Sequence, residues 1–460
     1  MRRISWPFVF FFSFLPIYWA YLTLTTQPVL VFDAVGYEYS GATLLHQGWR
    51  AYYQGLNREP LFPFLVSRAM ALGEAFSSPY YPFLKGILFV FLAVTLAGIY
   101  RLARLLGASR KFAAAGAFYA GVSPAIVNSA LWLWSEAAGL PWAVWGVFFF
   151  IKAWRSAVDR CLRRTLLLTL LSIVCFGGLF LVKAASSVVI LFYGAPLVIA
   201  GGVFLWRKDI GRVTAFVSAA VIFLGIFVSL VEGYKLFNFK MNGNYTVTTR
   251  VESALFGNTV RRLQPLTPAR IAQAVLSVPR LGLCERYYGR ACVFWGFPTS
   301  DAISGRANDF CEAQHFSPEE SRKFLLNGSF DLMKQHPFQQ AALSALEGTK
   351  MLFWENRVYF VRYPAWLARI YSHPGWVPGL CFIWALLSLA ALIFAVIRWS
   401  AAWLLTASFV FWFTAAYSIF FIDIRYGLPI APLFIAMVAA MFGGKGKTNT
   451  FGCISRNAEV

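Results

Sequence analysis

Residues 165–206 read TLLLTLLSIVCFGGLFLVKAASSVVILFYGAPLVIAGGVFLW, and a basic pair flanks them on each side. An α-helix needs about 20 predominantly apolar residues to cross the hydrocarbon core of a bilayer. This stretch holds two such runs, and Lys183 between them is its only charged residue. It therefore predicts two membrane spans, 165–182 and 186–206. The flanking pairs are Arg163, Arg164, Arg207 and Lys208.

The whole chain has the composition of a membrane protein. Of its 460 residues, 59% are hydrophobic and 13% are charged, whereas soluble domains carry about 25% charged residues. This composition excludes a large soluble enzyme with an apolar core. Hydrophobic runs predict ten spans in all. The other eight are 6–26, 80–100, 111–128, 133–151, 213–232, 376–397, 401–421 and 425–442.

The positions of the basic residues predict the orientation. With a cytoplasmic N-terminus, each predicted cytoplasmic turn carries Lys or Arg, whereas the outer turn near 123–135 carries neither. This is the distribution that the positive-inside rule describes. Orientation and attraction to anionic lipid or phosphate explain the formal net charge of +21, so no nucleic-acid partner is expected. The run 6–26 lacks a signal-peptide cleavage site and is interpreted as a span.

Two predicted outer segments, 27–79 and 233–375, are longer than connectors usually are. We expect a transmembrane module over 1–232 that includes the first outer loop, an extracytoplasmic loop domain over 233–375, and C-terminal spans with a short cytoplasmic tail over 376–460. The expected fold is an all-α polytopic membrane protein. It has about ten transmembrane helices, amphipathic helices at the outer face and a mainly helical loop domain.

Cap chemistry predicts helices inside these outer segments. Thr267-Pro268 and Pro337 can each open a helix, and the sequence SPEE at 317–320 is a capping box with Pro at the first helical position. A short helix after Asp33 is expected to end at Gly48. The stretch 338–354 is apolar on one side and is expected to lie along the membrane surface.

Three of the seven cysteines, Cys284, Cys292 and Cys311, fall together in the predicted outer loop. Disulfides persist outside the cytoplasm. Three cysteines allow one bridge and leave one thiol, and the sequence leaves open which two pair. Their spacing resembles no zinc motif, so no metal site is expected.

Ionisable residues near the outer ends of the predicted spans form the candidate site. Charges inside a bilayer are costly and usually face the protein interior or a water path. These charges come from segments far apart in the chain but fall at one depth, which predicts a cavity open to the outer leaflet. Each also has a structural interpretation, such as a surface pair or a lysine that reaches the headgroups. The acids are Asp33, Glu38, Glu59, Glu136, Glu232 and Asp423, and the bases are Arg58, Lys85, Lys183 and Arg425.

Four short motifs occur in order along the chain. Asp33 is followed by Tyr37 and Tyr39 and then by A-x-x-L-x-x-G over 42–48. Residues 58–63 read REPLFP, Ser135-Glu136 opens the fourth predicted span, and residues 423–429 read DIRYGLP. Together they resemble the membrane glycosyltransferases of the C superfamily, in the branch of the protein O-mannosyltransferases and the lipid A aminoarabinose transferases.

The resemblance has two departures. Lys183 stands where relatives often carry an arginine, which weakens the case for a phosphate contact there. The segment 233–375 matches the family in position alone, so the acceptor stays open.

This resemblance implies the transfer of a hexose or pentose from a polyprenyl-phosphate donor to an acceptor at the extracytoplasmic face. Transfer would invert the anomeric carbon and need no nucleotide, metal or other cofactor. The acceptor is a lipid, a glycan or a protein, and membrane lipids are the other partners. The implied location is a bacterial inner membrane.

Asp33 is the expected general base, because it stands first in the motifs and lies where the first loop meets the membrane. Glu136 is the second candidate, to orient the acceptor or share the base role, and Glu59 is the third. The expected ligands of the donor phosphate are Arg58, Lys85, Lys183 and Arg425. The residues expected to line the substrate are Tyr37, Tyr39, Asp423 and Tyr426.

Three alternatives remain open. A transporter or flippase of a polyprenyl-linked glycan would share the spans and buried charges, although the two halves of this chain do not resemble each other as transporter repeats often do. A lipid-glycan ligase would centre on Arg and His residues of a large outer loop. A non-catalytic structural membrane protein is the third. The ligase residues would be Arg261, Arg262, His315 and His336.

Overall fold

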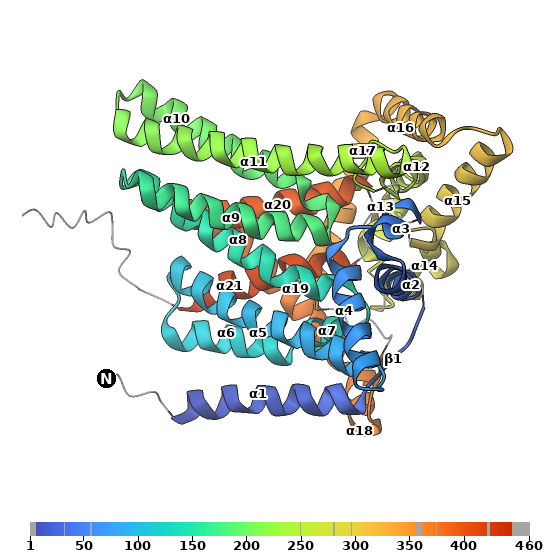
Figure 1. The fold of residues 1–460 in the computed structure, drawn as a ribbon, viewed down its shortest axis with the longest axis horizontal. Coiled ribbons are helices and arrows are strands. Elements are labelled where there is room, and N and C mark those ends of the chain that lie inside the picture. Colours follow the sequence, from blue (N-terminus) through green and yellow to red (C-terminus); the bar gives the residue numbers. More distant parts are fainter. Residues whose placement is uncertain are drawn as a thin grey trace, which may run out of the picture.

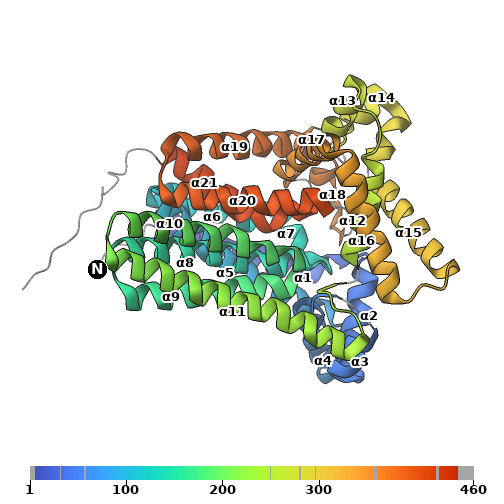
Figure 2. The same ribbon diagram turned by 90° about the horizontal axis from the view of Figure 1, so that it is seen from above.

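The computed structural model describes residues 6–31, 33–55, 58–248, 250–278, 281–295, 297–355, 361–373, 375–420 and 424–443. They form a bundle of long helices that run side by side, with a group of shorter helices on one end (Figures 1 and 2). We call this end the loop-domain end. Helices dominate the described chain, whose sheet has two short strands. The predicted all-α polytopic fold with a helical loop domain is confirmed.

Eight helical segments of the described chain are long and apolar enough to cross a membrane. They correspond to eight of the ten predicted spans. They are α5 (Tyr81–Leu106), α8 (Ser135–Val158), α9 (Leu162–Val182), the segment Ala184–Trp206, α11 (Ile210–Asn242), α19 (Trp376–Arg398), α20 (Ala401–Phe420) and the segment Arg425–Phe442.

Two of these spans are composite. Ala184–Trp206 comprises η1 (Ala184–Val188), a π-helical turn η2 (Ile190–Gly194) and α10 (Ala195–Trp206). Arg425–Phe442 comprises most of η5 (Ile424–Ile430) followed by α21 (Ala431–Phe442).

The first and third of the ten predicted spans are not among these eight segments. The first forms α1 (Trp6–Thr25), a helix of 20 residues that runs alongside the bundle (Figure 1). The continuous helix expected over 111–128 is instead two helices, α6 (Arg110–Val122) and α7 (Pro124–Leu131). Pro124 has no N–H to continue the hydrogen bonds of α6. The Ser123 hydroxyl starts α7 by accepting the Ile126 N–H at 3.2 Å.

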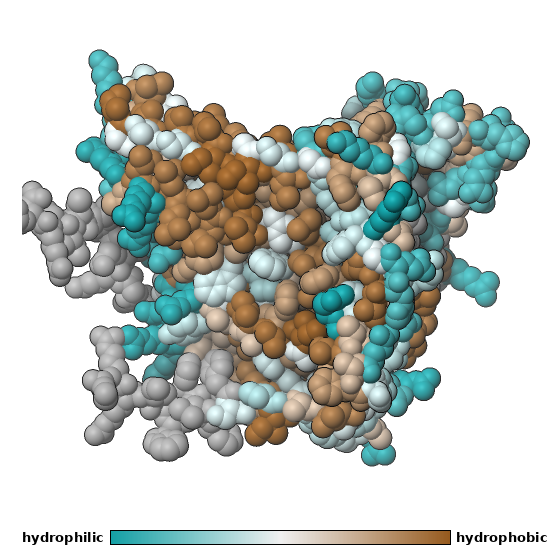
Figure 3. Space-filling model, viewed as in Figure 1, coloured by the Kyte–Doolittle hydropathy of each residue, from teal (hydrophilic) through white to brown (hydrophobic). Residues whose placement is uncertain are grey.

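The surface has an apolar middle between two hydrophilic ends. On the face shown in Figure 3, hydrophobic residues gather over the bundle and hydrophilic ones over its two ends. Val198, Ile199 and Val221 on α10 and α11 are more than half exposed, as residues that face lipid are. The turns α5–α6, α8–α9 and α10–α11, where the basic residues lie, are at the same end as the start of α1 and opposite the loop domain (Figure 1).

The first outer segment folds onto the loop-domain end. It comprises β1 (Gln27–Pro28), α2 (Asp33–His46), α3 (Gly48–Gly55) and α4 (Leu61–Ala75). Gly48 ends the first short helix as predicted, because its φ of +81° suits a residue without a side chain. β1 pairs antiparallel with β2 (Val361–Arg362), so the segment after α1 meets the segment that precedes the last spans.

The second outer segment forms the short helices of the loop-domain end. α11 continues past residue 232 and carries the chain out of the bundle into them (Figure 1). The predicted helix starts are confirmed: Thr267 caps α13, Ser317 and Glu320 form a capping box on α16, and Pro337 opens α17. The elements are α12 (Arg250–Arg261), α13 (Pro268–Leu276), α14 (Leu283–Tyr288), η3 (Gly289–Trp295), α15 (Phe297–Ala313), α16 (Pro318–Gln335), α17 (Pro337–Gly348), η4 (Thr349–Phe353) and α18 (Ala365–Ser372).

The stretch 338–354, which the sequence predicts to lie along the membrane surface, forms α17 up to Gly348 and then the turn η4. Phe338 is 79% exposed, but Met351 and Trp354 are buried in the main core, because η4 turns inward against η5. Gly427 permits this contact: a Cβ there would lie 2.6 Å from the Met351 carbonyl oxygen.

One disulfide joins Cys284 to Cys292, and the Cys311 thiol is free and buried. The sequence leaves open which two of the three cysteines pair, and in the structure Cys284 and Cys292 do.

A buried cluster, which we call the clamp, consists of Arg261, Arg262, Glu347 and Lys350. Both arginines, at and just after the end of α12, contact the Glu347 carboxylate of α17, and the Lys350 ammonium lies 3.7 Å from it. All four residues are at most 3% exposed. One carboxylate thus holds three cations together inside the protein.

The clamp also attaches the loop domain to the bundle. Arg262 donates to the carbonyl oxygens of Ser418 and Ile419, and Asn258 of α12 donates to that of Phe420. These carbonyls lie at the end of α20, where the helix dipole favours positive charge. The ligase alternative assigns Arg261 and Arg262 to chemistry. In the structure Arg262 serves this attachment, and Arg261 is bound within the loop domain to Trp295, Asn258 and Glu347.

Glu347→Gln is expected to lower the free energy of unfolding by about 3–5 kcal/mol, because three buried cations would lose their carboxylate. A denaturant titration in detergent micelles measures this. Glu319→Gln on the surface of α16 is the control and is expected to leave the unfolding curve unchanged. Equal stability of both variants would contradict the role of the clamp.

The same cluster predicts a pH dependence. Burial raises the pKa of the Glu347 carboxyl, but Arg261, Arg262 and Lys350 outweigh burial and bring the pKa to about 2, below its ordinary 4.5. A carboxyl with a lowered folded-state pKa stabilises the fold above its unfolded-state pKa. The stabilisation by Glu347 is therefore expected to fall as the pH drops from about 4.5 towards 2, and Glu347→Gln should lack this component.

Candidate active site

Four regions of the chain meet at the loop-domain end of the bundle and form a cluster of paired charges. Asp33 is the first residue of α2, Arg58 precedes α4, Glu136 lies in the first turn of α8, and Arg425 lies in η5. Lys183, between α9 and η1, joins them. All five are among the residues that the sequence pattern grouped.

The Asp33 carboxylate lies between two guanidinium groups. Its Oδ1 is 3.3 Å from Arg58 Nη2, and its Oδ2 is 2.8 Å from Arg425 Nη2. The Asp33 side chain is 22% exposed, and the two arginine side chains are 8% and 13% exposed. The carboxylate is thus the most accessible member of this group.

The Arg58 guanidinium packs closely against Gly36 and Tyr37 of α2, and we call this packing site the seat of Arg58. Its guanidinium carbon lies 4.5 Å from the centre of the Tyr37 ring. A Cβ on Gly36 would lie 2.5 Å from Arg58 Nη2, so a glycine is needed for the guanidinium to approach the helix. The buried Tyr52 hydroxyl donates to the Arg58 carbonyl at 2.9 Å, and burial raises the pKa of this hydroxyl, which keeps its proton.

Glu136 and Lys183 form the second pair. Lys183 Nζ lies 2.8 Å from Glu136 Oε1, and the side chains are 11% and 2% exposed. Lys183 also lies 5.4 Å from the centre of the Tyr426 ring. The Tyr37 hydroxyl shares a hydrogen bond of 3.0 Å with Ser135 Oγ, which links this pair to the seat of Arg58.

Aromatic rings position Arg425. Its guanidinium carbon lies 5.2 Å from the centres of both the Trp134 and Tyr426 rings, a range in which the ring faces attract cations. Tyr417 of α20 stacks on Tyr426 at 4.6 Å. The sequence pattern missed Trp134 and Tyr417, although Trp134 directly precedes the Ser135-Glu136 motif.

Three other predicted acids, Glu59, Glu38 and Glu232, have structural partners. Glu59 accepts the Ala184 N–H at 2.9 Å and so fixes the start of η1. Glu38 accepts the hydroxyls of Tyr80 and Tyr81 at 2.6 and 2.9 Å. Glu232 pairs with Lys235 at 2.7 Å.

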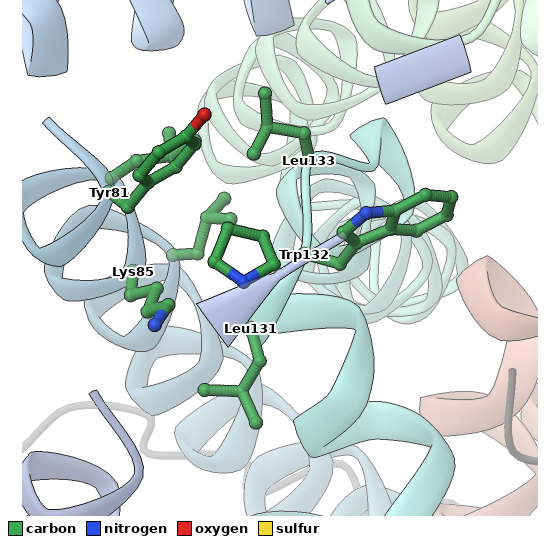
Figure 4. A pocket seen from close by; sticks show the side chains of 8 residues that line it. Tyr81, Lys85, Leu131, Trp132 and Leu133 are labelled. Carbon is green, nitrogen blue, oxygen red and sulfur yellow. The ribbon is translucent and has the colours of Figure 1, made fainter. Parts of the chain in front are cut away.

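Lys85 also lies apart from the paired charges. Its ammonium donates to Thr23 O and to both oxygens of Thr26, at the end of α1, which takes up its three N–H groups. Together with Tyr81 and Trp132 it borders a small hollow that is too narrow for a water molecule (Figure 4). A role in holding a donor phosphate therefore has no support from its contacts.

Two further predicted residues differ in their surroundings. Tyr37 is buried within the cluster, whereas Tyr39 is 63% exposed on the surface of α2. Asp423 lies outside the described residues.

Glu355 is a buried acid that the sequence interpretation did not single out. It accepts the Ser123 hydroxyl at 2.7 Å and the Ala125 N–H at 3.2 Å, at the break between α6 and α7. Burial raises its pKa to about 7. Among the described residues, no three His, Cys, Asp or Glu side chains are grouped as metal ligands would be.

Comparisons with known proteins find similarity among solved structures. No family model matches the chain, and no curated protein matches it. The solved structure of the archaeal oligosaccharyltransferase AglB from Archaeoglobus fulgidus, in complex with an inhibitory peptide and a dolichol-phosphate, is 13% identical to this chain with a TM-score of 0.48. The match covers 95% of this chain and 50% of AglB, so the chain spans about half the length of that protein. At this level of similarity, the function has to be argued from the residues of the chain itself.

The pairing of Asp33 with Arg425 is expected to appear as a coupling energy. In a double-mutant cycle with Asp33→Asn and Arg425→Gln, the two effects on the free energy of unfolding should differ from additivity by about 0.5–3 kcal/mol, as for residues in contact. Asp33→Asn with Lys85→Met is the matched control and should be additive, because Lys85 binds oxygens of α1. Coupling in the control pair and none in the first would contradict this geometry.

Proposed function

We propose that this chain is an inverting glycosyltransferase of the membrane, which transfers a sugar from a polyprenyl-phosphate donor to an acceptor at the loop-domain end without a metal. The observation that carries the proposal is the Asp33 carboxylate between the guanidinium groups of Arg58 and Arg425. A candidate general base and two candidate phosphate ligands thus lie within one hydrogen-bonded group.

The charges of this group suit a phosphate. A guanidinium offers parallel N–H donors that match phosphate oxygens, and such charge-assisted bonds are strong. Arg58 and Arg425 bracket Asp33 from two sides, so a phosphate that enters competes with the carboxylate for the same donors. Donor binding then transfers the arginines from Asp33 to the phosphate and leaves the carboxylate open to accept a proton.

The reaction proceeds by displacement at the anomeric carbon. The acceptor hydroxyl oxygen forms a bond to this carbon while the bond from carbon to the phosphate oxygen breaks. The bonding electrons leave with the polyprenyl phosphate, whose charge Arg58 and Arg425 stabilise. Asp33 takes the proton of the acceptor hydroxyl as general base. Attack opposite the leaving phosphate inverts the configuration.

Glu136 and Lys183 have a positioning role in this proposal. Glu136 is 2% exposed and pairs with Lys183. It therefore holds the Lys183 ammonium near the Tyr426 ring, and this ring is the neighbour of Arg425. Glu59 fixes η1 from the other side. Lys85 is left out of the phosphate site, because its ammonium binds α1.

The proposed location follows from the basic turns. They lie at the end opposite the paired charges, and the positive-inside rule assigns such an end to the cytoplasm. The reaction therefore takes place on the extracytoplasmic side. The proposed membrane is a bacterial inner membrane, because the sequence motifs resemble a bacterial branch of the superfamily. The acceptor is a lipid, a glycan or a protein that approaches the paired charges at the loop-domain end.

The first test is binding of undecaprenyl phosphate to the protein purified in detergent. Arg58→Gln and Arg425→Gln are expected to weaken binding about tenfold or more, because each removes a charge-assisted contact worth roughly 1.5–3 kcal/mol. Asp33→Asn should still bind. Lys235→Gln, a basic residue of α11 outside the paired group, is the matched control and should bind as the wild type does.

Transfer is then tested with polyprenyl-phosphate hexoses and pentoses against lipid, glycan and peptide acceptors. The wild type should form product, and Asp33→Asn should form none. If the wild type binds undecaprenyl phosphate no better than a generic anionic lipid, the proposal fails, and transport or ligation takes its place. Full activity of Asp33→Asn would show that Asp33 is not the general base.

Gly36→Ala tests the seat of Arg58 separately from its charge. The added methyl group would displace the guanidinium, which is the flexible end of its side chain, so the fold should be retained. Affinity for undecaprenyl phosphate should fall towards that of Arg58→Gln, while thermal unfolding stays close to that of the wild type. Gly233→Ala on α11, where the added Cβ meets open space, is the control. Unchanged binding in Gly36→Ala would show that this seat does not position Arg58.

A further inference from the structure

The helix α18 lies at the end of α1 (Figure 1), and α19 is the next helix along the chain. Two contacts with α1 fix α18: the Trp366 indole N–H donates to the Tyr21 hydroxyl at 2.8 Å, and the hydroxyls of Tyr18 and Tyr371 lie 3.4 Å apart. Tyr371 is buried on the inner side of α18. The outer side of the helix is therefore held in a fixed position at the rim of the bundle.

This outer side and the start of α19 border an open hollow of about 600 Å³. Its lining is Arg369, Ile370, His373, Gly375 and Trp376. Arg369 lies in the last turn of α18, and His373 is the residue that caps the end of this helix. His373 Nδ1 accepts the Gly375 N–H at 3.3 Å, which leaves the proton of a neutral imidazole on Nε2 as a donor. The hollow thus joins a guanidinium and an imidazole N–H at the N-terminus of a long helix, where negative charge is favoured.

The surroundings of the hollow suit the boundary between headgroups and acyl chains. Ile370 and Trp376 are about half exposed, and Trp is enriched at this boundary. From the hollow, α19 continues along the bundle with exposed apolar residues. These are Phe382, Ile383, Leu386, Leu389 and Ile393, each between 45% and 54% exposed.

We propose that this hollow binds the phosphate group of a membrane glycerophospholipid, whose acyl chains lie along α19. Arg369 and His373 donate to the phosphate oxygens, and Trp376 packs against the glycerol region. The site belongs to elements other than those of the Asp33 group and does not depend on the proposed reaction. A bulk lipid of the surrounding bilayer is the occupant, because the lining faces outward from the rim.

Native mass spectrometry of the detergent-purified protein with added phosphatidylglycerol tests the site. The wild type is expected to retain one tightly bound lipid, and the double variant Arg369→Gln/His373→Gln should bind it about tenfold more weakly. Arg369→Lys, which keeps the charge, should retain most of the affinity. Arg362→Gln is the matched control, since Arg362 is exposed on nearby β2 but does not line the hollow. All these side chains are exposed, and thermal unfolding of each variant checks that its fold is kept.

Three comparisons identify the ligand. Diacylglycerol with the same chains should not bind in place of phosphatidylglycerol, and inorganic phosphate should not displace it. Undecaprenyl phosphate should bind this site more weakly than phosphatidylglycerol does. Equal retention of phosphatidylglycerol by the wild type and the double variant would overturn the proposal. Tighter binding of undecaprenyl phosphate, lost in the double variant, would overturn the choice of lipid.

Discussion

The arrangement at the loop-domain end depends on one carboxylate that neutralises two arginines. Arg58 and Arg425 come from opposite ends of the chain, and both are largely removed from solvent. Two such cations repel each other unless an anion lies between them, and burial makes an unpaired charge costly. Asp33 supplies the anion, and Gly36, Tyr37, Trp134 and Tyr426 shape the space around the group. An incoming anion would therefore meet cations that are already positioned and a carboxylate that it can replace.

The clamp in the loop domain extends this arrangement. Arg262 binds carbonyls at the end of α20, and η5 with Arg425 is the next element along the chain. Met351 and Trp354 follow the clamp and pack against η5 from the other side, at Gly427. The loop domain therefore helps to hold Arg425 as well as covering the end of the bundle. A ligand that shifts α12 or α17 would have a short physical route to the paired charges.

Much of this fold could be predicted from local sequence patterns, because span length, basic turns and cap residues act over a few residues. Eight spans, three helix starts and the end of a short helix at Gly48 follow in this way. The direction in which a span residue points could not be predicted as well. α5 is apolar on most sides, so its pattern does not tell which neighbour Lys85 faces. The sequence places Lys85 at the same predicted depth in the bilayer as Arg58 and Arg425. In the structure the Lys85 side chain packs towards α1 instead. The break at Pro124 and the pairing of Cys284 with Cys292 likewise depend on tertiary contacts.

The contacts that join α1 to α18, which we call the seam, have a consequence for the order in which the protein folds during synthesis. Tyr18 and Tyr371 are 353 residues apart, and β1 and β2 join the same two regions of the chain. During synthesis α1 precedes its partners on α18, which emerge only after most of the described spans. Until then the polar groups of Tyr18, Tyr21 and residues 27–28 need other partners, such as water, lipid or an insertion factor. This seam is expected to close late in biogenesis.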